Sequence, residues 1–175
     1  MNYLNDNRNC LYVAGIEEES VVDGPGIRFT IFTQGCNHHC KGCHNPETWD
    51  YSPEALKDKV MSFEDILNKL NNNPLCSSIT LSGGDPVLQA KKLCDFIKYL
   101  KDNNCNKPIL MFTGYTLEEL KSSDNLKIQE LLTLVDSIID GPFIQEQKSL
   151  ELKFRGSRNQ RYWIKDSNGE FMSGD

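Results

Sequence analysis

The chain has 175 residues, 38% of them hydrophobic and 25% charged, and its 25 acidic and 19 basic side chains give a formal net charge of −6. A folded chain of this length buries about 70% of the surface that the unfolded chain exposes, so it can build a core without disulfide bonds. Its longest apolar run covers residues 10–14, whereas a membrane-spanning helix needs about 20 apolar residues. Binding to a nucleic-acid backbone depends on Lys and Arg, which are in the minority here. We therefore expect one cytoplasmic domain over residues 1–175, with no membrane or nucleic-acid partner.

Hydrophobic patterns predict strands that alternate with helices along the chain. The expected strands cover residues 27–34, 78–81, 108–112 and 137–139. The expected helices cover residues 62–71, 88–101, 117–121 and a segment that ends at residues 131–134. Ser62 with Asp65 is expected to cap the first of these helices, and Thr116 with Glu119 the third.

Alternating strands and helices are typical of a parallel sheet with right-handed crossovers. A complete eight-unit barrel takes about 250 residues, so this chain has room for only part of one. The predicted fold class is α/β, an open, incomplete (β/α) barrel with a mainly parallel sheet. Loops rich in glycine follow each expected strand, and ligands bind where the carboxyl ends of parallel strands open into loops.

Three of the seven cysteines, Cys36, Cys40 and Cys43, lie within eight residues on the loop after the first expected strand. Three thiolates on one short loop indicate a metal centre. An iron–sulfur cubane held by three cysteines leaves one iron open to a small molecule. Structural zinc is the alternative, with His38, His39 or His44 as the fourth ligand, and the spacing alone does not separate the two. The other four cysteines are expected to be small buried side chains.

Gly83, Gly84 and Asp85 follow the second expected strand. Two glycines allow close approach of the backbone and positive φ angles, which leaves backbone groups free to meet a ligand. The alternative is a tight turn from strand to helix, with Pro86 at the first helical position. Asp140 follows the fourth expected strand, where a side chain can face a ligand, although Asp-Gly-Pro is also ordinary turn chemistry.

The order of these motifs resembles the radical S-adenosylmethionine superfamily, since Cys-x3-Cys-x2-Cys follows the first strand and Ser-Gly-Gly-Asp-Pro the second. The segments DGPGIRF at residues 23–29 and CHNPETW at residues 43–49 narrow the resemblance to activases of glycyl-radical enzymes. With DGPF at residues 140–143 and RGSRNQR at residues 155–161, the chain from about residue 11 to residue 165 is similar to the family that activates anaerobic ribonucleoside-triphosphate reductase.

The resemblance implies a radical S-adenosylmethionine fold and a 4Fe-4S cluster on Cys36, Cys40 and Cys43, which are then the metal-binding and catalytic residues. S-adenosylmethionine would chelate the fourth iron and be cleaved reductively to methionine and a 5′-deoxyadenosyl radical. That radical would take a hydrogen from a glycine near the C-terminus of the reductase and leave a glycyl radical there. A flavodoxin-like protein is implied as the electron donor.

The resemblance also assigns further residues. The expected cofactor-binding residues are Gly42, Cys43, His44, Gly83, Gly84, Asp85 and Asp140. Asp23 and Gly24 are expected to contact the partner's glycine-containing backbone. The chain departs from the superfamily at Asp85, where Glu is more frequent, and at Gly42, where many relatives carry an aromatic residue.

Three points stay open at this level. The alternatives are an activase of another glycyl-radical enzyme, such as formate lyase, and a zinc-stabilised interaction module without catalysis. Residues 145–165 carry six basic and two acidic side chains. This stretch either meets the ligand carboxylate or an acidic face of the reductase, or is solvated surface.

Overall fold

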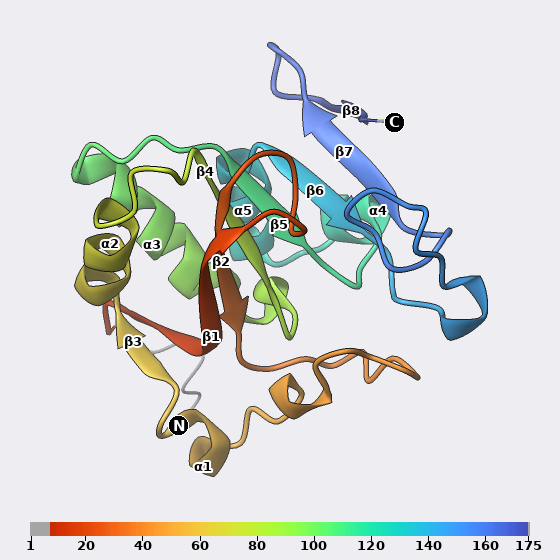
Figure 1. The fold of residues 1–175 in the computed structure, drawn as a ribbon, viewed down its shortest axis with the longest axis horizontal. Helices are drawn as coiled ribbons and strands as arrows, with labels where there is room; N and C mark the ends of the chain where they lie inside the picture. The colour runs from red at the N-terminus through yellow and green to blue at the C-terminus, as the bar shows by residue number, and fades with distance from the viewer. Residues whose placement is uncertain (1–7, 175) are drawn as a thin grey trace.

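The computed structural model describes residues 8–174, which form one eight-stranded sheet with the order β3-β1-β2-β4-β5-β6-β7-β8 (Figure 1). The strands are β1 (Cys10–Ser20), β2 (Arg28–Thr33), β3 (Val60–Ser62), β4 (Ser78–Gly83), β5 (Ile109–Phe112), β6 (Ser137–Asp140), β7 (Arg161–Lys165) and β8 (Phe171–Ser173). The α-helices are α1 (Pro53–Leu56), α2 (Phe63–Asn71), α3 (Ala90–Asp102), α4 (Leu117–Lys121) and α5 (Leu126–Leu134). Short 3-10 helices are η2 (Pro46–Thr48), η3 (Pro86–Gln89) and η4 (Gln145–Gln147). The predicted domain also includes residues 1–7 and 175, which lie outside the described part.

The sheet is mixed, and this corrects the expectation of a mainly parallel one. Its four central strands, β2, β4, β5 and β6, are parallel, as the four expected strands were. Among the described strands, β3 and β1 extend one side of the sheet and β7 and β8 the other, all through antiparallel pairings. None of these four flanking strands was predicted. The sheet order leaves β3 and β8 as edges, so the fold is mixed α/β with one open sheet, and a barrel shape remains a prediction.

The helices begin where the sequence has capping residues. The Ser62 hydroxyl accepts a hydrogen bond from the Asp65 backbone N–H and so begins α2, as expected. Thr116 and Glu119 form the reciprocal capping box of α4. The helix expected over residues 88–101 is α3, and η3 precedes it.

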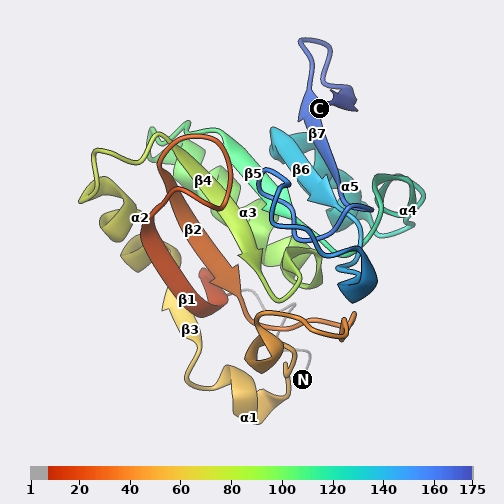
Figure 2. The same cartoon turned by 45° about the vertical axis from the view of Figure 1, so that its right-hand side comes forward.

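The main core lies between the sheet and the helices α2, α3 and α5 (Figures 1 and 2). Phe29 and Ile31 of β2 and Phe96 of α3 are among its fully buried side chains. Burying each such side chain stabilises the fold by about 1.5–3 kcal/mol. Arg28 and Thr30 lie on the other face of β2, and the buried Arg28 guanidinium donates hydrogen bonds to Thr80 Oγ1 and to the Ile79 carbonyl.

The four parallel strands open into loops at one edge of the sheet (Figure 2). Backbone hydrogen bonds continue past the ends of β2 and β4, from Gly84 N–H to the Thr33 carbonyl at 2.8 Å and from Asp85 N–H to the Gly35 carbonyl at 2.7 Å. The cysteine loop therefore starts from a backbone that is held on its neighbouring strand. Within residues 8–174, no helix has the length and apolar character that crossing a membrane requires.

Candidate functional site

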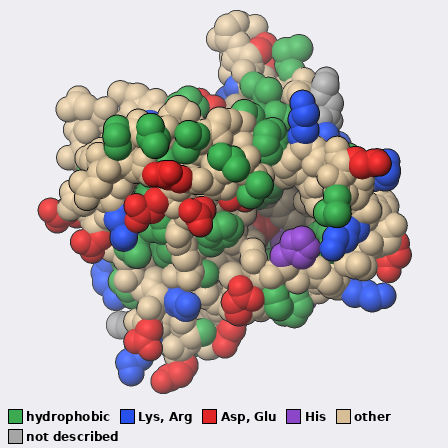
Figure 3. Space-filling model, in the orientation of Figure 1, with side chains coloured by type: hydrophobic (Ala, Val, Ile, Leu, Met, Phe, Trp, Pro, Cys, Tyr) green, Lys and Arg blue, Asp and Glu red, His purple; other side chains and the backbone are tan. Residues whose placement is uncertain are grey.

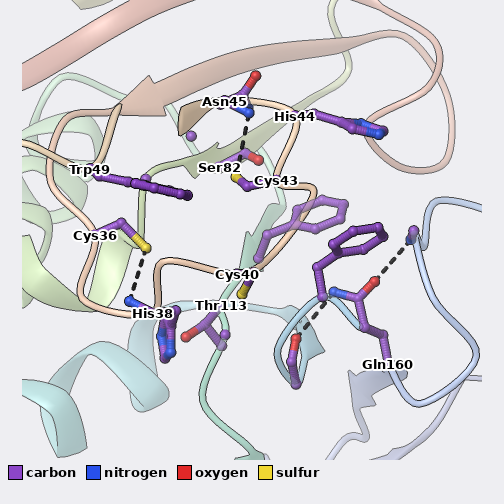
Figure 4. A pocket seen from close by; sticks show the side chains of 17 residues that line it. Cys36, His38, Cys40, Cys43, His44, Asn45, Trp49, Ser82, Thr113 and Gln160 are labelled. Atoms are coloured by element: carbon purple, nitrogen blue, oxygen red, sulfur yellow. Dashed lines mark hydrogen bonds between the residues drawn. The ribbon is translucent and has the colours of Figure 1, made fainter. Parts of the chain in front are cut away.

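A cavity of about 220 Å³ opens at the carboxyl ends of the parallel strands (Figure 4). Its wall comes from the cysteine loop and from the loops that follow β4, β5 and β6. Cys36, Cys40 and Cys43 all line it, as do Gly83 and Gly84. The structure thus brings the predicted thiols and the glycine pair to one place, although they lie far apart in the sequence.

The three thiols are free, with Cys36 buried and Cys40 and Cys43 half-buried. Cys36 Sγ accepts a hydrogen bond from the His38 backbone N–H, and Cys43 Sγ accepts one from the Asn45 backbone N–H, each at 3.4 Å. Burial raises the pKa of the Cys36 thiol, while its hydrogen bond from the His38 N–H acts in the opposite direction. Backbone donors of this kind stabilise a thiolate, which is the form that binds metal.

The donor set fits an iron–sulfur cluster better than a closed zinc site. Iron–sulfur clusters are held by cysteine thiolates, and three of them face this cavity. The imidazoles that would complete a zinc site have other contacts, since His38 bonds Asp85, His39 packs against Trp49, and His44 packs near Phe143. In the described part of the chain, no three His, Cys, Asp or Glu side chains are grouped so that they would hold a metal ion. The three cysteines therefore fit an iron–sulfur cluster by the chemical type of their donor atoms.

The glycine pair is required by packing. A Cβ on Gly84 would lie 2.2 Å from the Gly35 carbonyl oxygen. A Cβ on Gly83 would lie 2.4 Å from the Thr33 nitrogen, and Gly83 has a φ of +102°. The backbones of the two strand exits therefore touch, and this contact sets the position of the residue before Cys36.

Asp85 is fully buried and does not line the cavity. Its carboxylate accepts hydrogen bonds from the Thr113 hydroxyl, at 3.1 and 3.0 Å, and from the Gly114 N–H, at 3.0 Å. His38 Nε2 lies 2.6 Å from the same carboxylate. This hydrogen bond raises the pKa of His38, and the negative charge of Asp85 acts in the same direction. Asp85 thus joins the cysteine loop to the exits of β4 and β5.

The tight turn considered as an alternative for this motif is also present. Asp85 caps η3 by accepting a hydrogen bond from the Val87 N–H at 3.0 Å, and Pro86 is the first residue of that helix. A turn and a cavity-facing glycine pair exist together here, because Gly83 and Gly84 line the cavity while the Asp85 side chain is buried in the protein. Direct cofactor binding by the Asp85 carboxylate remains a prediction.

Asp140 is also fully buried and lies outside the cavity wall, to which the neighbouring Gly141 contributes. Its carboxylate accepts hydrogen bonds from the Leu117 N–H at 2.7 Å and from Arg161 Nε at 3.1 Å. A contact between this carboxylate and a cofactor would have to replace those bonds. The sequence pattern showed the position of Asp140 at a strand exit but not its partner on β7.

Three other predicted residues lie away from the cavity wall. A Cβ on Gly42 would lie 2.0 Å from Gln145 Oε1, so Gly42 packs against η4. The Asp23 carboxylate accepts a hydrogen bond from the Ser20 hydroxyl at 2.6 Å. Gly24 packs against the side chains of Arg28 and Leu110. Their binding roles remain predictions.

Several cavity residues were not predicted. Three aromatic residues, Trp49, Phe112 at the end of β5 and Phe143, line the cavity, and so does Gln160. The Gln160 side chain accepts a hydrogen bond from the Gly156 N–H at 2.9 Å and donates one to the Gly141 carbonyl at 3.1 Å. Aromatic residues at or just after the end of an apolar strand are a signal that could have found Phe112 and Phe143.

Comparison with known proteins supports the assignment of a cluster site. Residues 22–163 match the model of a family described as a 4Fe-4S single cluster domain. The chain is 41% identical over 143 residues to the anaerobic ribonucleoside-triphosphate reductase-activating protein of Haemophilus influenzae, a match that covers 80% of this chain and 89% of the relative. The proteins of the same name from Vibrio cholerae and Escherichia coli K12 are 39% and 36% identical, over 80% of this chain and 89% and 90% of their own lengths.

Among solved structures, QueE from Escherichia coli aligns with a TM-score of 0.46 and 18% identity, over 65% of this chain and 56% of that one. This likeness is too low to support an inference about fold or function. The sequence relatives and the family model are decisive, because each covers most of the chain. The chain therefore belongs to the family of anaerobic ribonucleoside-triphosphate reductase-activating proteins.

Proposed function

We propose that the protein is a radical S-adenosylmethionine activase. Its 4Fe-4S cluster is held by Cys36, Cys40 and Cys43, and its substrate is a glycine near the C-terminus of anaerobic ribonucleoside-triphosphate reductase. One observation carries the proposal: three free thiols of a single loop line one cavity, in a chain whose relatives are named activators of that reductase. The flavodoxin-like electron donor is proposed from the family resemblance alone.

A cluster held by Cys36, Cys40 and Cys43 would supply the electron for reductive cleavage of S-adenosylmethionine to methionine and a 5′-deoxyadenosyl radical, which would take a hydrogen from the target glycine. The chain's own residues provide the surroundings for this chemistry. Gly83 and Gly84 present backbone rather than side chains to the cavity, and so leave room for a ligand's amino-acid portion. The rings of Trp49, Phe112 and Phe143 give part of the wall an apolar surface that excludes water from a reactive radical.

The cluster assignment is tested on protein purified without oxygen. We expect a brown protein with about four irons and four sulfides per chain. Changing Cys36, Cys40 or Cys43 to Ala should remove the iron and the absorbance. Cys105→Ala is the matched control, because this half-buried cysteine lies outside the cavity wall and should leave both unchanged. A single bound zinc and a colourless protein would contradict the proposal.

The reaction is tested in two further steps. Reduction with dithionite in the presence of S-adenosylmethionine should release methionine and 5′-deoxyadenosine, and the three cysteine variants should release neither. Electron paramagnetic resonance should then detect a glycyl radical on the reductase after activation. Formate lyase in the same assay should give no glycyl radical signal. A glycyl radical signal on formate lyase alone would change the assigned partner.

A further inference from the structure

A second hollow, of about 450 Å³, adjoins the cluster cavity and opens to the surface. We call it the outer groove. Its lining residues are Val21, Val22, His44, Lys148, Ser149, Leu150, Leu152, Phe154, Arg155 and Gly156. His44 and Gly156 line both hollows, so the outer groove and the cluster cavity share a wall. The space-filling view shows a hollow between hydrophobic side chains and a histidine on this side of the molecule (Figure 3).

The mouth of the outer groove exposes apolar side chains from two distant segments of the chain. Val21 and Val22, on the loop between β1 and β2, are 67% and 72% exposed, and Leu150, on the loop before β7, is 92% exposed. A single exposed apolar residue is ordinary, but apolar residues gathered at one opening mark an interaction site. The two loops therefore form a lip that a partner would cover.

The same lining carries positive charge. Lys148 and Arg155 both line the groove, and none of its lining residues, all of which lie in the described part of the chain, is Asp or Glu. The two acids on the segment that carries Lys148 and Arg155 have other basic partners, since Glu146 pairs with Lys41 and Glu151 with Arg158, each at 3.5 Å. The chain as a whole has a net charge of −6, so this local excess of cations runs against its overall sign. An acidic ligand fits this charge.

The position of the outer groove indicates what kind of ligand it would bind. Under the proposed function, the reacting glycine belongs to a protein, so its backbone has to reach the cluster cavity from the surface. The outer groove provides a surface that leads to the wall of that cavity. At the shared wall Gly156 packs against Phe143, since a Cβ on Gly156 would lie only 3.0 Å from the Phe143 ring. The reacting glycine would pass this wall to reach the cluster cavity, and neighbouring residues of an extended segment would lie in the outer groove.

We propose that the outer groove docks the extended, glycine-carrying segment of the reductase, with an apolar side chain of that segment against Val21, Val22 and Leu150 and an acidic one near Lys148 and Arg155. This inference rests on the proposed function and specifies the partner surface of the same site. The groove then sets how tightly the reductase binds, while the cysteine loop carries out the chemistry. Binding and radical formation are separable in such an arrangement.

The first test measures how much reductase is needed for half-maximal glycyl radical formation. Val22→Asp, Leu150→Asp and Lys148→Glu should each raise this concentration by about tenfold or more, the effect expected for anchors of an interface. Leu126→Asp and Lys57→Glu are the matched controls, because Leu126 is 81% exposed and Lys57 is exposed, and both lie outside the outer groove. The controls should change the concentration by less than about twofold, as ordinary surface substitutions do.

Iron content and cleavage of S-adenosylmethionine without reductase are measured on the same samples. Groove variants that keep both and lose affinity for the reductase support the inference. Groove variants that behave like the controls overturn it. If the unchanged protein holds no cluster or cleaves no S-adenosylmethionine, the proposed function itself fails, which is a different outcome.

A second test does not depend on activity. Leu150→p-benzoylphenylalanine places a photoreactive group at the mouth of the groove, and Leu126→p-benzoylphenylalanine serves as its control. Irradiation of each protein with the full reductase should cross-link only position 150, and mass spectrometry should locate the link in the glycine-carrying segment. A link from position 150 to another part of the reductase, or no link, would overturn the inference.

Discussion

His38 Nε2 lies 2.6 Å from a carboxylate oxygen of Asp85, and this contact fastens the cysteine loop to the exit of β4. The His38 ring also packs edge-on against Tyr115, at 4.5 Å between ring centroids, and a Cβ on Gly114 would lie 2.5 Å from it. One imidazole therefore joins the loop that carries the thiols to the exits of two strands. The cysteine loop is held in place by these protein contacts.

Replacing Asp85 should therefore destabilise the fold as well as the site. Asp85→Ala leaves the His38 imidazole, the Thr113 hydroxyl and the Gly114 N–H without their buried acceptor. Unsatisfied groups of this kind cost about 1–3 kcal/mol, and we expect a loss of about 3 kcal/mol because several are affected. Urea unfolding of the cluster-free protein measures it. Asp95→Ala, which removes a more exposed carboxylate on α3, should cost less than about 0.5 kcal/mol. Equal losses in the two variants would argue against the role of Asp85.

A methyl group at Gly84 should disturb the cysteine loop. The added Cβ would lie 2.2 Å from the Gly35 carbonyl oxygen, which belongs to backbone that cannot turn away like a flexible side chain. Overpacking of this kind costs about 1–3 kcal/mol, so Gly84→Ala should lower the free energy of unfolding by that amount and reduce the iron bound per chain. Gly15→Ala is the control, since nothing lies within 4 Å of its added Cβ. Full iron content in Gly84→Ala would show that the contact is not needed.

The pair of Arg161 and Asp140 should stabilise the fold more than the pair of Arg161 and Glu118. Arg161→Gln breaks both pairs and leaves the fully buried Asp140 carboxylate without its cationic partner. Breaking a buried pair costs about 3–5 kcal/mol, so the loss beyond that of Glu118→Gln reports the pair with Asp140. Glu118→Gln removes a largely exposed partner and should cost less than about 1 kcal/mol. Thermal or urea unfolding of both variants checks this order. The reverse order would mean that the Asp140 carboxylate is solvated or otherwise paired.

The same geometry has a consequence at acid pH. The Arg161 guanidinium holds the pKa of Glu118 below its ordinary value of 4.5. The stability that Glu118 contributes is therefore present above pH 4.5 and is lost as the pH falls through the lowered pKa. The difference in stability between the unchanged protein and Glu118→Gln should shrink on acidification.

Cys94 should make the fold sensitive to alkali. This side chain is fully buried, and burial raises the pKa of its thiol from 9.0 to about 12. Between these values the thiol ionises in the unfolded chain but not in the folded one. The free energy of unfolding therefore falls as the pH rises through this window. Between about pH 8 and about pH 10, this fall should be smaller for Cys94→Ala than for the unchanged protein. Parallel curves for the two proteins would contradict the burial effect. Alkylation of the folded protein should likewise spare Cys94.

The central part of the fold was predicted from the sequence, and the flanks were not, although β1 begins with the apolar run at residues 10–14 and β7 has the strand-like sequence RYWIK. The strands β2, β4, β5 and β6 have apolar runs that alternate with helix patterns and capping residues, so local signals agree with the final structure. The flanking strands have weaker signals. The second half of β1, with the sequence GIEEES, is polar, and β8 has three residues. Their extended form depends on pairing with neighbours, which a pattern along one segment does not reveal.

The candidate site shows the same division. The spacing of Cys36, Cys40 and Cys43 and the glycine pair pointed to the cavity, because both signals are local. The surroundings of Asp85 and Asp140 were not predictable, since their partners His38, Thr113 and Arg161 lie far away in the sequence. A carboxylate at a strand exit has the same local pattern whether it faces a ligand or a buried cation, and only the packing of distant segments decides between them.

The wall of the cavity is drawn from loops as far apart as Cys36 and Gln160. During synthesis the three thiols leave the ribosome early, while the segment that carries Phe143, Gly156 and Gln160 follows only near the end of translation. Until then the growing chain offers bare cysteines without an enclosing pocket. The wall of the cavity is therefore complete only when nearly the whole chain has been made.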